Sequence, residues 1–347
     1  MTEMAEQETE KELSENERLK QLAAQMREAE YKGLSEKEIQ EKERQKEMRK
    51  KRNVTILEDT LSIMENGCYE KAGRNIKLQF STEQMREIHV FLPDDIELLR
   101  TVYGSSKGSS ESQTQDAHCI FGCENADALV LAQKKYRDLK MNGELVPKVL
   151  VLNLASATQP GGQTRKGASA QEEDLCRRTS LLLSLESDGA RKYYEYNSAR
   201  KTRMGSDAIM LSPYVEVIKD FSSETLFEPF SVSVMSCAAP MVRLGLEGMS
   251  QREYEDMLSK RIQGMLLVAA SRGYRHLILG AFGCGMYGND AATVSDLFER
   301  VIRGFTYAGK GSGWLFDSIN FAVLCHSNKD YNYREFHRNF SSENKQI

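Results

Sequence analysis

The sequence predicts an α/β domain, a sheet covered by helices, preceded by a charged extension. Short apolar runs such as Val149–Leu154 and His276–Leu279 alternate with amphipathic segments of ten to twenty residues, which is typical of strands alternating with helices. In residues 1–52, charges of both signs interleave and aromatic residues are nearly absent, so this part favours helix but buries little. We therefore expect a helical or partly disordered extension over 1–52 and one domain over 53–347.

The spacing of apolar positions predicts the order of elements within residues 53–347. Apolar residues at helical intervals, with a glycine stop after the first segment, predict helices over 55–66, 125–139, 171–185, 251–270 and 292–304. Short apolar or alternating runs predict strands over 77–80, 87–91, 149–154, 213–217, 231–235, 276–279 and 318–324.

Composition and charge exclude several classes of protein. The formal net charge of -4, with no strongly basic segment, argues against a protein that coats DNA. Seven scattered cysteines are an odd set, so we expect free thiols in a reducing compartment rather than a disulfide framework. No run approaches the roughly 18 apolar residues of a membrane span, and the charged start lacks a signal core. These observations predict a cytoplasmic protein without a membrane partner.

The first candidate site follows the strand 149–154. A loop that contains Gly161 and Gly162 leads into the adjacent carboxylates of Glu172 and Glu173. Backbone N–H groups in such a loop suit a polyhydroxylated, phosphorylated ligand. Neighbouring side chains on a helix project about 100° apart, so we expect the two acids to have different tasks, and the positive helix end to keep both ionised. The alternative is ordinary first-turn acidic enrichment with Ser169 as N-cap.

The second candidate site is the glycine-rich segment 280–289, which follows the strand 276–279. Glycine lets the backbone approach a ligand and turn its N–H groups toward it, and a pyrophosphate is the natural occupant. Tyr287 packs on a ribose or simply fills the loop, and Asn153 binds a sugar hydroxyl or caps its strand. Both loops follow predicted parallel strands, so we expect them to meet in one crevice.

A metal site is not expected. His118, Cys119 and Cys123 lack a second pair of ligands at zinc spacing. Cys284, inside the second loop, is interpreted as a small packing residue rather than a nucleophile.

Several motifs in this order resemble the microbial-type poly(ADP-ribose) glycohydrolases, a branch of the macrodomain fold. They are the N-x-A-S-A run at 153–157, the Q-E-E run at 171–173 and the G-A-F-G-C-G run at 280–285. The likeness covers roughly Arg52 to the C-terminus and implies a macrodomain-like three-layer α/β/α fold with a mixed central sheet. The sequence departs from the family at Gln163, where a third glycine is usual, and at Gln159, where asparagine is usual.

The resemblance implies hydrolysis of ribose–ribose O-glycosidic bonds in poly(ADP-ribose), with release of ADP-ribose and without metal or cofactor. It implies that Glu173 is the general acid and base, and that Glu172 orients ribose hydroxyls. Implied partners are poly(ADP-ribose), ADP-ribosylated protein or ADP-ribosylated nucleic acid. The residues implied to contact ADP-ribose are Asn153, Ala155, Gly161, Gly162, Gln163, Gln171, Gly283, Cys284, Gly285, Met286 and Tyr287.

Three alternatives stay open at this point. One is a hydrolase that removes mono-ADP-ribose from protein or nucleic acid. Another is a non-catalytic ADP-ribose reader, because a side chain at Gln163 crowds the reacting geometry. The last is an interaction protein that acts through the charged extension and binds no ADP-ribose.

Overall fold

The chain forms two compact units, residues 1–49 and 50–347. The structure, a computed structural model, describes the chain in five stretches, which are 15–104, 119–145, 148–307, 310–327 and 330–341.

The first unit consists of helix α1 (Glu15–Tyr31) and the beginning of helix α2 (Glu36–Asn66). Ion pairs join Arg27 to Glu43 and Lys46 to Glu30. All four side chains are largely exposed, so each pair contributes at most about 1 kcal/mol. The helical character predicted for this part of the extension is confirmed.

The second unit is built on a mixed seven-stranded sheet. Its strands, in spatial order, are β3 (His89–Phe91), β6 (Ile209–Lys219), β7 (Thr225–Cys237), β5 (Val149–Leu154), β8 (His276–Leu279), β11 (Ser318–Ala322) and β4 (Ile120–Glu124). Strands β7, β5, β8, β11 and β4 are parallel, and β6 runs antiparallel to both of its neighbours, β7 and β3. The loops that follow β5, β7 and β8 therefore leave the same edge of the sheet.

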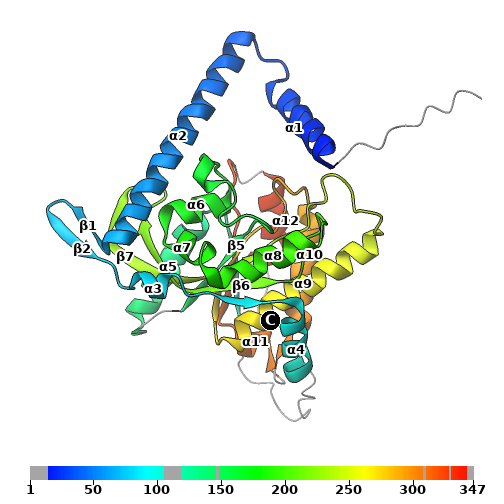
Figure 1. Ribbon diagram of the computed structural model, residues 1–347. Helices are drawn as coiled ribbons and strands as arrows, with labels where there is room; N and C mark the ends of the chain where they lie inside the picture. The colour runs from blue at the N-terminus through cyan, green and yellow to red at the C-terminus, as the bar shows by residue number, and fades with distance from the viewer. Residues whose placement is uncertain (1–14, 105–118, 146–147, 308–309, 328–329, 342–347) are drawn as a thin grey trace, which may run out of the picture. The chain divides into compact units, whose positions relative to one another are not determined.

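Helices cover both faces of this sheet (Figure 1). One face packs against α4 (Pro93–Gly104), α9 (Gln251–Ser271), α10 (Ala291–Gly304) and α12 (Tyr331–Phe340). The other packs against the end of α2 and against α5 (Ala128–Met141), α6 (Gln171–Arg178), α7 (Leu181–Leu185) and α8 (Arg191–Ala199). Within β5, Leu150 and Leu152 belong to the first core and Val149 and Val151 to the second, as the alternation of a strand requires. The predicted three-layer α/β/α fold is confirmed.

The remaining elements are short and peripheral. They are β1 (Cys68–Lys71), β2 (Arg74–Lys77), α3 (Thr82–Met85), the 3₁₀ turns η1 (Thr164–Lys166) and η2 (Asp188–Ala190), β9 (Thr306–Tyr307), β10 (Lys310–Gly311) and α11 (Ser312–Leu315).

The structure corrects several predicted elements. The single helix expected over 171–185 is two helices, because Thr179 is extended (φ −140°, ψ 173°) and bridges to Val217 of β6. The strand expected over 77–80 is wrong, since β2 ends at Lys77. Strand β4 was not predicted. It lies at the edge of the sheet, and its sequence is IFGCE. The isoleucine is exposed and the glycine has no apolar side chain, so the strand lacks a clear apolar pattern.

Truncating the aromatic centre of the first core tests this packing. Phe298 of α10 is fully buried, with ring centroids 5.2 Å from Phe321 and 6.3 Å from Phe336. We expect Phe298→Ala to lower the free energy of unfolding by ~3–5 kcal/mol, because a cavity replaces these contacts. Urea denaturation measures the loss, and Leu98→Ala, on the exposed side of α4, is the control. A loss no larger than that of the control would contradict this packing.

Candidate active site

The loop after β5 approaches the acidic start of α6 closely. Gly161 and Gly162 have φ values of +63° and +57°, the left-handed region that glycine adopts most readily. A Cβ at Gly162 would lie 2.6 Å from Oε1 of Glu173 and 3.1 Å from Oε2 of Glu172. Glycine is therefore required at this position both by the backbone conformation and by the space beside the carboxylates.

The two adjacent glutamates are held by different parts of the chain. Both are buried, with 3% of Glu172 and 7% of Glu173 exposed. Oε2 of Glu172 accepts a hydrogen bond from the Ser156 N–H at 2.7 Å, and Oε1 accepts one from Asn153 Nδ2 at 3.3 Å. Oε1 of Glu173 accepts from the Gln163 N–H at 2.9 Å. The end of β5 thus fixes one acid and the glycine loop fixes the other.

Two polar atoms of this group have no protein partner. Oε2 of Glu173 and Oδ1 of Asn153 are buried without a hydrogen bond, although Nδ2 of Asn153 also donates to Ser236 Oγ at 2.9 Å. Buried polar atoms are normally hydrogen-bonded. These two atoms are therefore suited to accept hydrogen bonds from a bound molecule that carries hydroxyl groups.

Burial changes the protonation of the first glutamate. It raises the pKa of Glu172 from 4.5 to about 8, an effect opposed by the hydrogen bonds from Ser156 and Asn153 and reinforced by the charge of Glu173. The expectation that the helix dipole keeps both acids ionised is therefore wrong for Glu172. The N-cap of α6 is Ala170 rather than Ser169, and no side chain caps the helix.

Gln171 joins α6 to the sheet. Its Oε1 accepts from the Leu154 N–H at 2.8 Å, and its Nε2 donates to the Leu152 carbonyl at 2.8 Å. The N–H of Ala155 continues the sheet by donating to the Cys237 carbonyl at 3.1 Å. Both residues position the end of β5, and ligand contacts of either remain predictions.

The unusual residue at position 163 does not strain the loop. Gln163 has φ −104° and ψ 29°, a conformation open to any residue. Its side-chain Nε2 donates to Oε1 of Gln159. The two residues that differ from the family pattern are therefore hydrogen-bonded to each other. The contact with Glu173 is made by the main-chain N–H, which a glycine would also supply.

The loop after β8 is held by a residue that the sequence analysis did not single out. Asn289 donates through Nδ2 to the carbonyls of Pro240 at 2.8 Å and Gly283 at 2.9 Å, and its Oδ1 accepts from the Tyr254 hydroxyl at 2.7 Å. Gly283 has φ +75°, and a Cβ there would collide with the Asn289 amide. The only sequence signal for Asn289 was its place at the end of the glycine-rich segment.

Arg243, also missed, binds two main-chain carbonyls of this loop. Its Nε donates to the Met286 carbonyl and its Nη2 to the Gly285 carbonyl, both at 2.9 Å. The main-chain hydrogen bonds found among the described residues leave the N–H groups of Gly285, Met286 and Tyr287 unused. Such a row of free amides binds anionic groups. Burial raises the pKa of the Cys284 thiol to about 12, which supports its interpretation as a packing residue.

The two loops lie beside each other. They follow β5 and β8, which are neighbouring parallel strands of the sheet. Burial raises the pKa of the Tyr287 hydroxyl, and the charges of Glu172 and Glu173 raise it further, in agreement with this placement. Two more buried hydroxyls without a partner, those of Tyr193 and Tyr194 in α8, also feel the charge of Glu172. The sequence contained no signal that these tyrosines approach the site.

A cavity of about 650 Å³ adjoins the second loop. Nδ2 of Asn332, in its wall, donates to the Cys284 carbonyl at 3.4 Å. The other lining residues are Phe221, Leu324, Cys325, His326, Asp330 and Tyr331. The hydrogen bond from Asn332 places one wall of the cavity next to the second loop.

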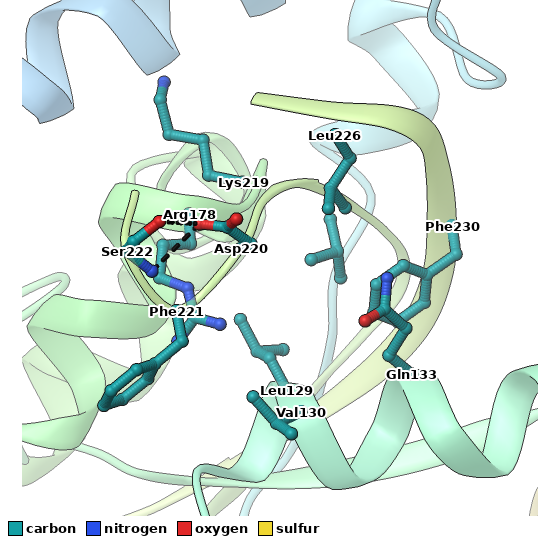
Figure 2. A pocket seen from close by; sticks show the side chains of 11 residues that line it. Leu129, Val130, Gln133, Arg178, Lys219, Asp220, Phe221, Ser222, Leu226 and Phe230 are labelled. Atoms are coloured by element: carbon teal, nitrogen blue, oxygen red, sulfur yellow. Dashed lines mark hydrogen bonds between the residues drawn. The ribbon is translucent and has the colours of Figure 1, made fainter. Parts of the chain in front are cut away.

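A second cavity, of about 330 Å³, lies apart from the predicted site residues, between α5 and the turn that joins β6 to β7 (Figure 2). Its cations already have partners. Arg178 pairs with Asp127 at 2.9 Å and Asp174 at 2.6 Å, and Lys219 pairs with Asp59 at 2.7 Å. The charges of this cavity therefore serve the packing of α2, α5 and α6.

The described residues were also searched for metal and membrane features. They contain no group of three or more His, Cys, Asp or Glu side chains arranged to hold a metal ion. Cys119, just before β4, and Cys123, within it, are both buried, while His118 lies outside the described residues. No helix within the described stretches is long and apolar enough to cross a bilayer.

The fold and this site define a macrodomain-like protein with two buried glutamates between amide-lined loops. Residues 57–220, somewhat less than half of the chain, match the family described as the catalytic domain of microbial-type PARG. The resemblance indicated by the sequence motifs is confirmed. A comparison with curated proteins gave no match.

Solved bacterial enzymes agree with this assignment. Poly(ADP-ribose) glycohydrolase from Thermomonospora curvata is 27% identical, with a TM-score of 0.71, over 83% of this chain and 99% of its own. The same enzyme bound to the inhibitor ADP-HPD gives a TM-score of 0.69. The Deinococcus radiodurans enzyme in complex with ADP-ribose is 28% identical, with a TM-score of 0.62, over 76% of this chain and 98% of its own.

The raised pKa of Glu172 predicts a pH-dependent stability. Because its folded-state pKa of about 8 exceeds the ordinary value of 4.5, the folded protein binds the extra proton between these pH values. The contribution of the protonated Glu172 to the free energy of unfolding is complete below about pH 4.5 and is lost as the pH rises through 8. We expect Glu172→Gln to be more stable than the wild type at pH 8, by on the order of 3 kcal/mol, and to lose this advantage at pH 5. Thermal unfolding at both pH values measures it, and an equal difference at the two would contradict the assignment.

Proposed function

We propose that this protein hydrolyses the ribose–ribose O-glycosidic bonds of poly(ADP-ribose) and releases ADP-ribose. The observation that carries the proposal is the state of Glu173. One of its oxygens is fixed by the Gln163 N–H, and the other is buried without a partner beside a backbone that only glycine allows. The likeness to glycohydrolases solved with ADP-ribose and with ADP-HPD supports the choice of substrate.

The arrangement of the site suits the three parts of ADP-ribose. The N–H groups of Gly285, Met286 and Tyr287 would bind the diphosphate together with the Gly161–Gly162 turn. The cavity of about 650 Å³ would take the adenosine, because Phe221, Leu324 and Tyr331 present exposed apolar surface there. The terminal ribose would then lie between Tyr287 and the two acids.

Glu173 would perform both proton transfers. It protonates the departing ribose oxygen as the oxocarbenium-like state develops, and the carboxylate so formed activates the incoming water. Glu172, with a pKa of about 8, is mostly protonated at pH 7, so it can donate to a ribose hydroxyl as well as accept. The free Oδ1 of Asn153 accepts a second hydroxyl proton. Gln171 and Ala155 would act by holding the end of β5.

The geometry at Gln163 favours a hydrolase over a non-catalytic reader. Its side chain bonds to Gln159, and its main chain holds Glu173, so the substitution leaves the contact with the acid in place. A panel of poly(ADP-ribose), mono-ADP-ribosylated protein and mono-ADP-ribosylated DNA separates polymer cleavage from removal of single units. The free state of all seven cysteines supports the proposed cytoplasmic, reducing location.

Removing the acid of Glu173 tests the mechanism. We expect Glu173→Gln to reduce kcat on poly(ADP-ribose) by at least ~10³-fold, because one carboxyl serves as both acid and base. ADP-ribose binding, measured by calorimetry, should persist because the diphosphate contacts are untouched. Turnover at the wild-type rate in this variant would remove Glu173 from the mechanism.

Adding a methyl group at Gly162 tests the contact between loop and acids. We expect Gly162→Ala to lower kcat by ~10²-fold or more, because the Cβ would displace the Glu173 carboxylate. Gly273→Ala is the matched control, since Gly273 has a similar φ of +71° but no atom within 4 Å of the added Cβ. Both variants carry the strain of a left-handed alanine, about 1–2 kcal/mol, so only the first should lose activity. Equal loss in the two would show that strain alone is responsible.

A further inference from the structure

The part of α2 that lies before the matched family region touches the catalytic loop. The family match begins at residue 57, inside α2, yet Lys50 and Asn53 of the same helix contact the segment between the glycine loop and the two glutamates. We propose that Asn53 is a positioning residue for the reaction, and that it holds this segment so that the Gln163 N–H stays aimed at Glu173. The inference rests on the proposed function for its kinetic consequence.

Asn53 reaches the loop through its side-chain amide. Nδ2 donates to the Gly167 carbonyl at 3.0 Å and to the Ala168 carbonyl at 3.4 Å. Asn53 is only 8% exposed. The Ala168 carbonyl also accepts from Arg177 Nη1, so removing the Asn53 amide would leave mainly the Gly167 carbonyl short of a partner in a site that water reaches poorly.

The backbones of helix and loop also pack directly against each other here. Gly167 has φ +75° and ends the turn η1. A Cβ at this position would collide with the Lys50 carbonyl and lie 2.8 Å from the Lys50 carbonyl carbon. The loop can approach α2 this closely only because Gly167 has no side chain.

A short path of hydrogen bonds leads from this contact to the catalytic acid. The Gln163 carbonyl accepts hydrogen bonds from the N–H groups of Lys166 at 2.9 Å and Ala168 at 3.3 Å. Gln163 is therefore bonded directly to Ala168 in the segment 167–168, whose carbonyls accept from Asn53. The Gln163 N–H in turn donates to Glu173 Oε1. A shift of residues 167–168 would therefore move the donor that orients Glu173.

The same helix makes a comparable contact that does not involve the loop. Thr60 Oγ1 donates to the Arg177 carbonyl in the last turn of α6, and accepts from Lys219 Nζ at 2.7 Å. It is a side-chain donor on a main-chain acceptor, like the contact of Asn53, but at the opposite end of α6 from the two acids. Thr60 therefore offers a matched control for effects that are purely structural.

The test compares Asn53→Asp with Thr60→Val in the full chain. The aspartate is nearly isosteric, but it replaces the amide donor with an oxygen that repels the Gly167 and Ala168 carbonyls. We expect kcat on poly(ADP-ribose) to fall on the order of tenfold or more, with KM within about twofold, because the misplaced acid affects the chemical step. Thr60→Val should lower the melting temperature while leaving kcat unchanged.

Amide hydrogen exchange gives a readout that does not depend on activity. We expect faster exchange of residues 161–170 in Asn53→Asp, and no change there in Thr60→Val. Asn53→Ser keeps a shorter hydrogen-bond donor, so residues 161–170 should exchange at a rate between those of the wild type and Asn53→Asp. If Asn53→Asp does not fold, Asn53→Ser takes its place in the comparison. Equal exchange of this segment in the Asn53 and Thr60 variants would overturn the proposal. A wild-type protein that cleaves no ADP-ribosylated substrate would instead refute the proposed function, and the exchange comparison would still decide the role of Asn53.

Discussion

The site depends on how closely a left-handed glycine turn packs against two buried carboxylates. At Gly162 the distance from a hypothetical Cβ to the Glu173 carboxylate is 2.6 Å, so no side chain fits between the loop and the acid. The same approach lets the next N–H, that of Gln163, donate to Glu173. Without it the acid would be buried with neither oxygen bonded, and burying an unpartnered carboxylate is strongly unfavourable.

The two acids differ because their surroundings differ. Glu172 is bonded by Ser156 and Asn153, yet burial still raises its pKa to about 8. The dipole of a short helix acts mainly within its first turn and is worth at most about 2 kcal/mol, which is too little to offset the loss of hydration here. One glutamate thus becomes a hydrogen-bonding group that carries its own proton, while its neighbour keeps one buried oxygen without a protein partner.

The sequence predicted much of this fold because the relevant signals are local. The apolar run of β5 and the amphipathic pattern of α9 could be recognised residue by residue, and the order of the loop motifs identified the family. Edge strand β4 was missed because its pattern is weak, and the break at Thr179 was missed because a bridge to Val217 of β6 imposes it. Contacts between segments distant in the sequence leave no periodic trace.

By itself, the sequence determined the α/β class, both glycine loops and the two candidate acids, because the backbone freedom of glycine and the carboxyl groups of glutamate are properties of the residue types themselves. Only the tertiary structure decided how these parts work together. Burial raises the pKa of Glu172, Asn289 and Arg243 shape the second loop, and Asn53 reaches the catalytic segment across 114 residues of sequence. Each of these depends on which atoms meet in space, and therefore on packing that no local pattern encodes.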